Sequence, residues 1–358
     1  MKFLRQRPED EYIDELKALR ENDTRPKPQN WFLSPWAVLR YVMGGKLENG
    51  FEITPKYIGN QRLIEIAIAT LASDRALLLM GVPGTAKSWV AEHLTTAISG
   101  DSTLLIQGTA GLGEENLRYN WNYAQLLAKG PSFEALVESP LMRAMQTGKI
   151  ARIEEFTRLS SDVQDTLISI LSEKMLSIPE LKEEVSARKG FNVICTANDR
   201  DRGVNELSSA LKRRFNTIIL PLPSSIEEEV VIVKTRVAKM SKNLELPAEL
   251  PPLEEIKRLV TIFKELREGK TLDSKHKLKS PSSTLSSAEA ISVINDGLSL
   301  AAHFGNGRLG AYDLAAGING AVIKEPSRDK KIWVEYLEIV MKNREEWKDL
   351  YLACRELL

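Results

Sequence analysis

The segment GVPGTAKS, residues 81–88, contains the residue types that bind nucleotide phosphates. It follows an apolar run and precedes an amphipathic helical pattern, the strand–loop–helix context that the motif G-x-x-x-x-G-K-[ST] requires. Backbone N–H groups of such a loop converge on phosphate oxygens, and the dipole of the following helix favours the anion. We expect Lys87 to reach the β- and γ-phosphates and Ser88 to ligate Mg²⁺. The sequence therefore predicts a site for a nucleoside triphosphate and Mg²⁺.

Ala86 is the departure of this loop from the motif, which has glycine before the lysine. A side chain is costly there only if the backbone needs a positive φ or leaves no space for a Cβ atom. Because the loop is already turning into the helix, we expect a right-handed conformation at Ala86. Its methyl group is then a small perturbation, and the loop is still predicted to bind nucleotide.

A second group of chemically useful residues ends the apolar segment IARIEE, residues 150–155. Nucleotide hydrolysis needs one acid to support the magnesium shell and another to orient the attacking water. We assign the first role to Glu154 and the second to Glu155, although a Walker B strand normally ends in Asp-Glu. Taken alone, two glutamates would equally fit a solvated strand end. Beside a phosphate loop, they are interpreted as site residues.

Polar residues in two later segments complete the predicted site. The segment FNVICTAND is an apolar strand pattern that ends in Asn198, whose amide can place a water between the γ-phosphate and Glu155. The segment ELSSALKRRFN offers Arg213 and Arg214, and an arginine there can stabilise transition-state charge in a neighbouring subunit. Such a basic cluster also occurs as a solvated face, so the assignment depends on the other motifs.

The elements that position these residues lie between about residues 53 and 223. There, short β-branched runs alternate with helical patterns. The alternation predicts the α/β class, with a parallel sheet covered by helices. We expect an N-terminal helical extension and linker (1–50), a nucleotide-binding domain (51–223) and a C-terminal all-helical domain (224–358). The predicted strands are residues 76–80, 103–108, 150–154, 191–197 and 216–222.

Composition limits the class of protein. The chain has 358 residues, of which 43% are apolar, with 49 basic and 49 acidic side chains. This zero net charge, without a basic array interleaved with aromatics, argues against nucleic acid as the main partner. No apolar run approaches the roughly 20 residues of a membrane span, and the charged N-terminus is not a secretory signal. We therefore expect a cytoplasmic protein.

The motifs together resemble the MoxR-type AAA+ ATPases over about residues 53–323. The matching segments include ITPKYIGNQRLIEIAIATL, GVPGTAKS, SPLMRAMQTGKIARIEEFTRL, TAND and ELSSALKRRF. The resemblance implies ATP as the nucleotide and aligns Arg214 best with the trans-acting arginine finger. It places Tyr57, Ile58 and Gly59 at the adenine. The remaining nucleotide contacts are Gly81, Val82, Pro83, Gly84, Thr85, Ala86, Lys87, Ser88 and Trp89.

The same resemblance has consequences for architecture and assembly. It implies a P-loop AAA+ core with a parallel five-stranded sheet in 5-1-4-3-2 order, followed by an all-helical lid. It also implies a homo-oligomeric ring, usually hexameric, with the nucleotide between subunits and a chaperone-like role. Within the family, the chain is most similar to members encoded beside von Willebrand factor A-domain proteins, which suggests such a protein as a partner.

Two segments depart from the common family pattern. In the insert 109–136, Tyr119, Trp121 and Tyr123 alternate with asparagines, a period of two that predicts a β-ribbon. Its aromatic row would either pack on the core or face a pore or partner. In the lid, residues 280–282 read Ser-Pro-Ser where the family commonly has Ser-Pro-Arg. Two alternatives stay open: Lys277 or Lys279 substitutes for the arginine, or the serines only cap the next helix.

Three hypotheses for function follow. The first is an ATPase that remodels or matures a partner protein. The second is a nucleotide-binding scaffold that hydrolyses ATP poorly, as Ala86, Glu154 and the missing lid arginine suggest. The third is a nucleic-acid motor or a restriction-type NTPase, against which the charge balance argues.

Overall fold

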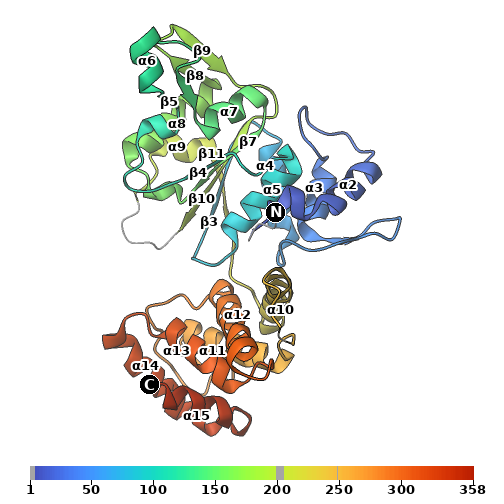
Figure 1. Cartoon of the computed structure of the whole chain (residues 1–358), viewed down its shortest axis with the longest axis vertical. Coiled ribbons are helices and arrows are strands. Elements are labelled where there is room, and N and C mark those ends of the chain that lie inside the picture. Colours follow the sequence, from blue (N-terminus) through green and yellow to red (C-terminus); the bar gives the residue numbers. More distant parts are fainter. Residues whose placement is uncertain (1–4, 199–204, 248) are drawn as a thin grey trace. The chain divides into compact units, whose positions relative to one another are not determined.

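The computed structural model describes residues 5–198, 205–247 and 249–358 (Figure 1). The chain forms two compact units. The first contains Arg5–Gly81 and Ala86–Leu220, and the second contains Pro221–Leu358 together with the loop Val82–Thr85. The loop Val82–Thr85 links the two segments of the first unit along the chain. Within the described ranges, no helix has both the length and the apolar character that crossing a bilayer requires.

A parallel five-stranded sheet forms the centre of the first unit (Figure 1). Its strands are β3 (Ala76–Gly81), β4 (Leu105–Gln107), β7 (Ile150–Glu154), β10 (Asn192–Asn198) and β11 (Phe215–Ile219). The order β11-β3-β10-β7-β4 is 5-1-4-3-2 when these strands are numbered along the chain, which confirms the predicted α/β topology. The register pairs Asn198 with Gly81, so the carboxyl ends of β10 and β3 lie side by side.

Helices cover both faces of this sheet, because alternate residues of each strand point to opposite faces. Leu77 and Leu79 of β3 share a core with the first group of helices, whereas Ala76 and Leu78 share a core with the second. The first group is α3 (Pro35–Met43), α4 (Gln61–Leu71) and α5 (Lys87–Ser99), and the second is α7 (Pro140–Thr147) and α8 (Ser161–Glu173). The short elements η2 (Phe156–Arg158) and α9 (Ser209–Arg214) precede α8 and β11.

The N-terminal segment packs against the helix that follows the phosphate loop. It contains α1 (Pro8–Glu11) and α2 (Ile13–Asn22), and a short antiparallel pair, β1 (Gly45–Lys46) with β2 (Glu52–Ile53), follows α3. Tyr12, Leu16 and Leu19 are buried in the same cluster as Val90 and Leu94 of α5. This packing brings the chain's first helices close to the helix that carries Lys87 and Ser88.

Two β-hairpins are inserted into the α/β unit. In the first, β5 (Tyr119–Trp121) pairs antiparallel with β6 (Leu136–Glu138). The short helix η1 (Glu114–Asn116) precedes β5, and α6 (Tyr123–Lys129) lies between the two strands in the chain. The predicted ribbon is thus confirmed for residues 119–121, where Tyr119 is buried. It is wrong at Tyr123, because Asn122 caps a helix that begins there, and Tyr123 is 68% exposed. In the second hairpin, β8 (Met175–Ile178) pairs with β9 (Glu183–Ser186).

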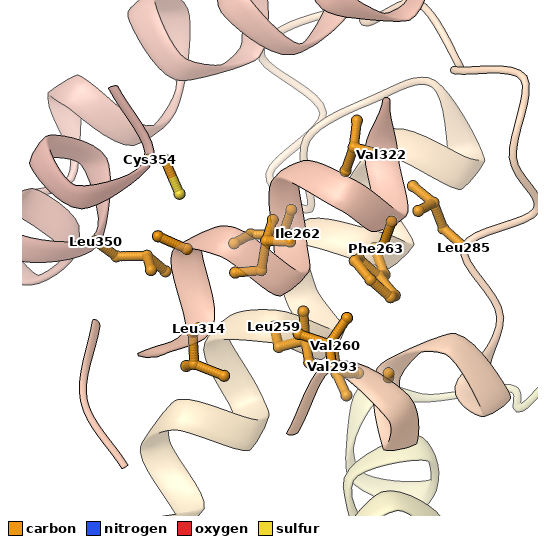
Figure 2. Packing of buried hydrophobic residues seen from close by; sticks show 14 of the residues in the cluster. Leu259, Val260, Ile262, Phe263, Leu285, Val293, Leu314, Val322, Leu350 and Cys354 are labelled. Atoms are coloured by element: carbon orange, nitrogen blue, oxygen red, sulfur yellow. The ribbon is translucent and has the colours of Figure 1, made fainter. Parts of the chain in front are cut away.

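The second unit consists of helices around one apolar core, as predicted (Figure 2). Phe263 and Val260 of one helix pack near Val293 of another, and Leu314, Leu350 and Cys354 line the same core. The helices are α10 (Ile226–Asn243), α11 (Leu253–Glu268), α12 (Ser287–Phe304), α13 (Ala311–Val322), α14 (Pro326–Ile339) and α15 (Lys348–Glu356), with η3 (Met341–Asn343) and η4 (Glu345–Trp347) between the last two.

Candidate nucleotide site

The phosphate loop joins β3 to α5 through several positive φ angles. Gly84 has φ +84°, and Ala86, at the N-cap of α5, has φ +63° and ψ +21°. The prediction of a right-handed Ala86 is therefore wrong. Reversing the chain from the strand into the helix places this residue in the left-handed region, which costs an alanine about 1 kcal/mol relative to glycine. This positive φ explains why the motif usually has glycine at the position of Ala86.

Lys87 and Ser88 begin α5 and point their polar atoms toward the sheet edge. The buried Lys87 Nζ donates to the carbonyl oxygen of Gly81 at 2.9 Å, which closes the loop across its own ends. Ser88 Oγ donates to Glu154 Oε2 at 2.5 Å. The predicted phosphate-loop hydroxyl and the predicted metal-supporting carboxylate are thus brought together.

Glu154 ends β7 and is buried with both carboxylate oxygens engaged. Oε2 accepts from Ser88 and, at 2.5 Å, from Thr196 Oγ1 of β10, while Oε1 accepts from Arg152 Nη1 at 3.1 Å. Sequence reasoning missed both Thr196 and Arg152. The signal for Arg152 was available, because it is the one charged residue before the glutamates in the apolar segment IARIEE.

Arg152 is fixed by further contacts around its guanidinium group. Nη2 donates to the carbonyl oxygen of Ser102 at 3.2 Å and lies 4.0 Å from Glu92 Oε1 of α5. Burial lowers the pKa of Arg152 below its ordinary value, while the carboxylates of Glu154 and Glu92 oppose this shift. The guanidinium group of an arginine is not deprotonated in proteins, so Arg152 is cationic at neutral pH. The result is a buried cation between two carboxylates.

Glu155 follows the strand and faces the end of β10. Its backbone has φ +53°, and Asn198 Nδ2 lies 3.2 Å from Oε1 and 3.1 Å from Oε2 of its carboxylate. Arg158 Nε lies 3.4 Å from Oε2 as well, and the Glu155 backbone N–H donates to Thr196 Oγ1 at 3.2 Å. The acid and the amide predicted to handle the attacking water are therefore neighbours.

The predicted adenine-contacting segment is held against α5 and the N-terminal helices. Tyr57 is buried, and its backbone N–H donates to Val42 at 3.0 Å. Trp89 Nε1 donates to the carbonyl oxygen of Lys56 at 2.7 Å. The ammonium group of Lys56 pairs with Glu15 and lies over the ring of Tyr12, 4.2 Å from its centroid. Ile58 and Gly59 follow, half-buried.

The two predicted finger arginines differ in environment. Arg214, at the end of α9, donates to Ser172 Oγ and, at 2.7 Å, to the carbonyl oxygen of Ala210. Arg213 is exposed. Arg214 is thus hydrogen-bonded within its own chain, whereas the side chain of Arg213 is turned to the surface.

The chemistry of the site fits a hard divalent cation. Mg²⁺ prefers oxygen ligands, usually from one or two protein groups with waters and phosphates completing its shell. Ser88 Oγ and Glu154 Oε2 supply two such oxygens 2.5 Å apart, next to the phosphate loop. These two residues would hold the ion in a nucleotide complex.

Two known families match separate parts of the chain. The AAA domain of the dynein-related subfamily matches residues 76–215, and the C-terminal domain of YehL-like AAA+ ATPases matches residues 227–357. The first match covers the phosphate loop, the acidic pair, Asn198 and the finger arginines but not the predicted adenine segment 57–59, and the second covers almost all of the helical unit. The AAA+ part of the resemblance is therefore confirmed, and the C-terminal match is to the YehL-like group. The MoxR-type assignment stays a prediction.

Individual proteins agree with this result. The uncharacterized protein YehL of Escherichia coli K12 is 39% identical over 353 residues, covering 97% of this chain and 95% of its own. The uncharacterized protein YojN of Bacillus subtilis 168 is 27% identical over 161 residues, which cover 43% of this chain and 50% of that protein. The crystal structure of NtrX from Brucella abortus in complex with ADP has a TM-score of 0.50 at 13% identity, covering 78% of this chain and 59% of its own. The last likeness concerns the fold alone.

Proposed function

Since the chain belongs to the YehL-like AAA+ ATPases, we propose that it binds ATP with Mg²⁺ at residues 81–88 and hydrolyses it to remodel or mature a partner protein. The observation that carries the proposal is a pair of side-chain hydrogen bonds at the neighbouring ends of β7 and β10. Ser88 contacts Glu154 at 2.5 Å, and Asn198 contacts Glu155 at 3.1 Å. Parallel sheets bind their ligands at this edge.

Each residue of the site has its own role in the proposed hydrolysis. Lys87 binds the phosphates, and Ser88 with Glu154 holds Mg²⁺, which supplies charge stabilisation at the phosphates when bound. Glu155 orients the attacking water and accepts its proton, and Asn198 fixes the direction of the Glu155 carboxylate through hydrogen bonds of 3.1–3.2 Å.

Ring assembly would complete the site in trans. An arginine from a neighbouring subunit would stabilise the charge that develops on the transferred phosphoryl group. Arg214 aligns best with that role by resemblance, while Arg213 is the more exposed of the two. We infer a homo-oligomeric ring, hexameric by the MoxR-type resemblance, in which basal turnover is weak and rises on assembly. A von Willebrand factor A-domain protein is the proposed partner.

A nucleotide-binding scaffold with little hydrolysis is the second candidate. Ala86 has φ +63° in the phosphate loop, and Glu155 lies 3.4 Å from Arg158 as well as against Asn198. Both features would slow turnover, the first by straining the loop and the second by occupying the catalytic carboxylate. The scaffold would bind and exchange ATP without measurable turnover.

The deciding experiment measures Mg²⁺-dependent ATP hydrolysis against protein concentration. The variants are Lys87→Ala, Glu155→Gln, Arg213→Ala and Arg214→Ala, with exposed Lys212→Ala on the same helix as the control. We expect specific activity to rise with concentration, to vanish in the first two variants, and to lose this rise in one of the arginine variants.

Two other results would change the conclusion. Activity independent of concentration in the wild type would exclude the trans arginine and the ring requirement. ATP binding by a wild type whose turnover equals that of Lys87→Ala would favour the scaffold.

A further inference from the structure

Arg152 is a buried arginine in the middle of β7, only 5% exposed, with apolar neighbours on either side in the sequence. Burying a charge is costly unless it is paired, so the residue needs a reason to be there. We propose that Arg152 is a positioning residue that fixes the Mg²⁺-supporting carboxylate of Glu154, an inference that rests on the proposed ATP site.

The two carboxylate oxygens of Glu154 have different partners. Arg152 lies two residues earlier on the strand, so both side chains project from the same face. Its Nη1 donates to Oε1 at 3.1 Å. Oε2 is thereby left facing Ser88 Oγ at 2.5 Å, the hydroxyl that shares the proposed metal. Arg152 thus holds the oxygen that is not needed for the ion.

A glutamate needs this support more than an aspartate would. Glu154 stands where Walker B strands normally have aspartate, and its extra methylene adds one rotatable bond that must be ordered when the ion binds. A planar guanidinium group can restrict that bond because it is itself rigid. The two departures in IARIEE, an arginine inside the strand and a glutamate at its end, are explained together.

The guanidinium group has further contacts besides Glu154, including one of 3.5 Å from Nη1 to the carbonyl oxygen of Ser88. It donates to Ser102 at 3.2 Å and lies 4.0 Å from Glu92, and Arg5 Nη2 lies 2.5 Å from the other oxygen of Glu92. Repulsion between Arg152 and a bound cation opposes its positioning effect. Because Glu92 offsets the charge and Arg152 contacts Oε1 rather than Oε2, the oxygen that Ser88 Oγ contacts, we expect positioning to dominate.

The test is a Mg²⁺ titration of the binding of a fluorescent ATP analogue to the full chain, with a second measurement in EDTA. Arg152→Gln should raise the Mg²⁺ concentration for half-maximal binding about 10–100-fold, the usual cost of losing a partner of a metal ligand. Arg152→Lys should restore part of this loss. Affinity in EDTA should stay unchanged, because the phosphate loop is intact.

Double variants separate positioning from general damage. Glu154→Asp is too short to keep the contact with Arg152, so adding Arg152→Gln to it should change the Mg²⁺ requirement by less than about threefold. Lys149→Gln is the control, since it removes a cation that immediately precedes the same strand but pairs with Asp101 at 2.9 Å. If Arg152→Gln does not fold, Arg152→Lys in the wild-type and Glu154→Asp backgrounds gives the same comparison.

The outcomes distinguish this inference from the function it rests on. Wild-type protein whose nucleotide binding ignores Mg²⁺ would overturn both. Normal Mg²⁺ dependence with unchanged or tighter Mg²⁺ binding in the Arg152 variants would overturn the positioning role alone. An equal loss of affinity in EDTA and in Mg²⁺ would also overturn it, because a general structural defect has that effect.

Discussion

Glu154 in the α/β unit and Glu265 in the helical unit are both buried carboxylates with an arginine beside them. Glu265 accepts from Tyr336 Oη and Arg344 Nη2, each at 2.6 Å, and from the backbone of Leu272 at 2.9 Å. Glu154 likewise accepts from an arginine and from hydroxyl groups. Burial and charge pairing therefore do not distinguish a site from a structural anchor.

The partners and the backbone around the two acids do differ. The three donors named for Glu265 all belong to the helical unit, as Glu265 does. Ser88, a donor to Glu154, instead belongs to a loop whose motif binds phosphate. Ala86 and Glu155, both with positive φ, lie close in sequence to Ser88 and Glu154. Positive φ alone is not diagnostic, since Leu285 of the helical unit has φ +45°. A strained backbone points to function only together with chemistry at a strand end.

The largest expected effect separates function from stability at the α/β site. Glu155→Gln keeps the size of the side chain but removes the base, so ATP hydrolysis should fall about 10²–10⁴-fold. The free energy of unfolding should change by less than about 0.5 kcal/mol, as for substitutions outside the core. Steady-state hydrolysis and urea unfolding measure the two. Unchanged hydrolysis would remove Glu155 from the catalytic role.

The reverse pattern is expected at Glu265. Glu265→Ala leaves Arg344 and Tyr336 without their buried acceptor, and breaking a buried pair in this way costs about 3–5 kcal/mol of unfolding free energy. Urea denaturation followed by circular dichroism measures the loss. Glu345→Ala, whose side chain is 90% exposed, is the control and should stay near wild type. Equal stability of the two variants would contradict the anchoring role of Glu265.

A third prediction concerns backbone strain in the phosphate loop. Ala86→Gly should stabilise the protein by about 1 kcal/mol, because glycine adopts φ near +63° without a steric penalty. Ala302→Gly, the same change inside α12, should destabilise by about 1 kcal/mol through lost helix propensity. Thermal unfolding of both variants gives the two signs. A destabilised Ala86→Gly would show that the methyl group packs usefully and that the angle carries no cost.

The elements that position the site were largely predictable from the sequence. Strand–loop–helix context located residues 81–88. The acids Glu154 and Glu155 at the end of β7 and the asparagine at the end of β10 followed from the strand ends of one parallel sheet. Hydrophobic periodicity and the turn residues between segments determine these features locally. The resemblance supplied the 5-1-4-3-2 order, which depends on contacts between distant segments.

What the sequence did not predict depends on how distant segments meet. The left-handed angle of Ala86 arises from closing the loop between a fixed strand and a fixed helix, which no local propensity contains. Arg152 acquires its meaning only where β7, Glu92 of α5 and Glu154 converge. Tyr123 continued a period of two, but the asparagine before it starts a helix.

The smallest expected effect is a pH response of an exposed acid, which completes the comparison of carboxylates. Hydrogen bonds from Thr271 Oγ1 and the backbone of Lys275 lower the pKa of Asp273 to about 2. The unfolded chain has a value of about 3.9, so between these values the unfolded state binds more protons. The contribution of Asp273 to stability is therefore present above about pH 4 and is lost as the pH falls toward 2. Asp273→Asn should flatten the dependence of the urea midpoint on pH in this window, whereas Asp296→Asn, an exposed control on α12, should not. An unchanged slope in Asp273→Asn would mean that the loop bonds do not persist in solution.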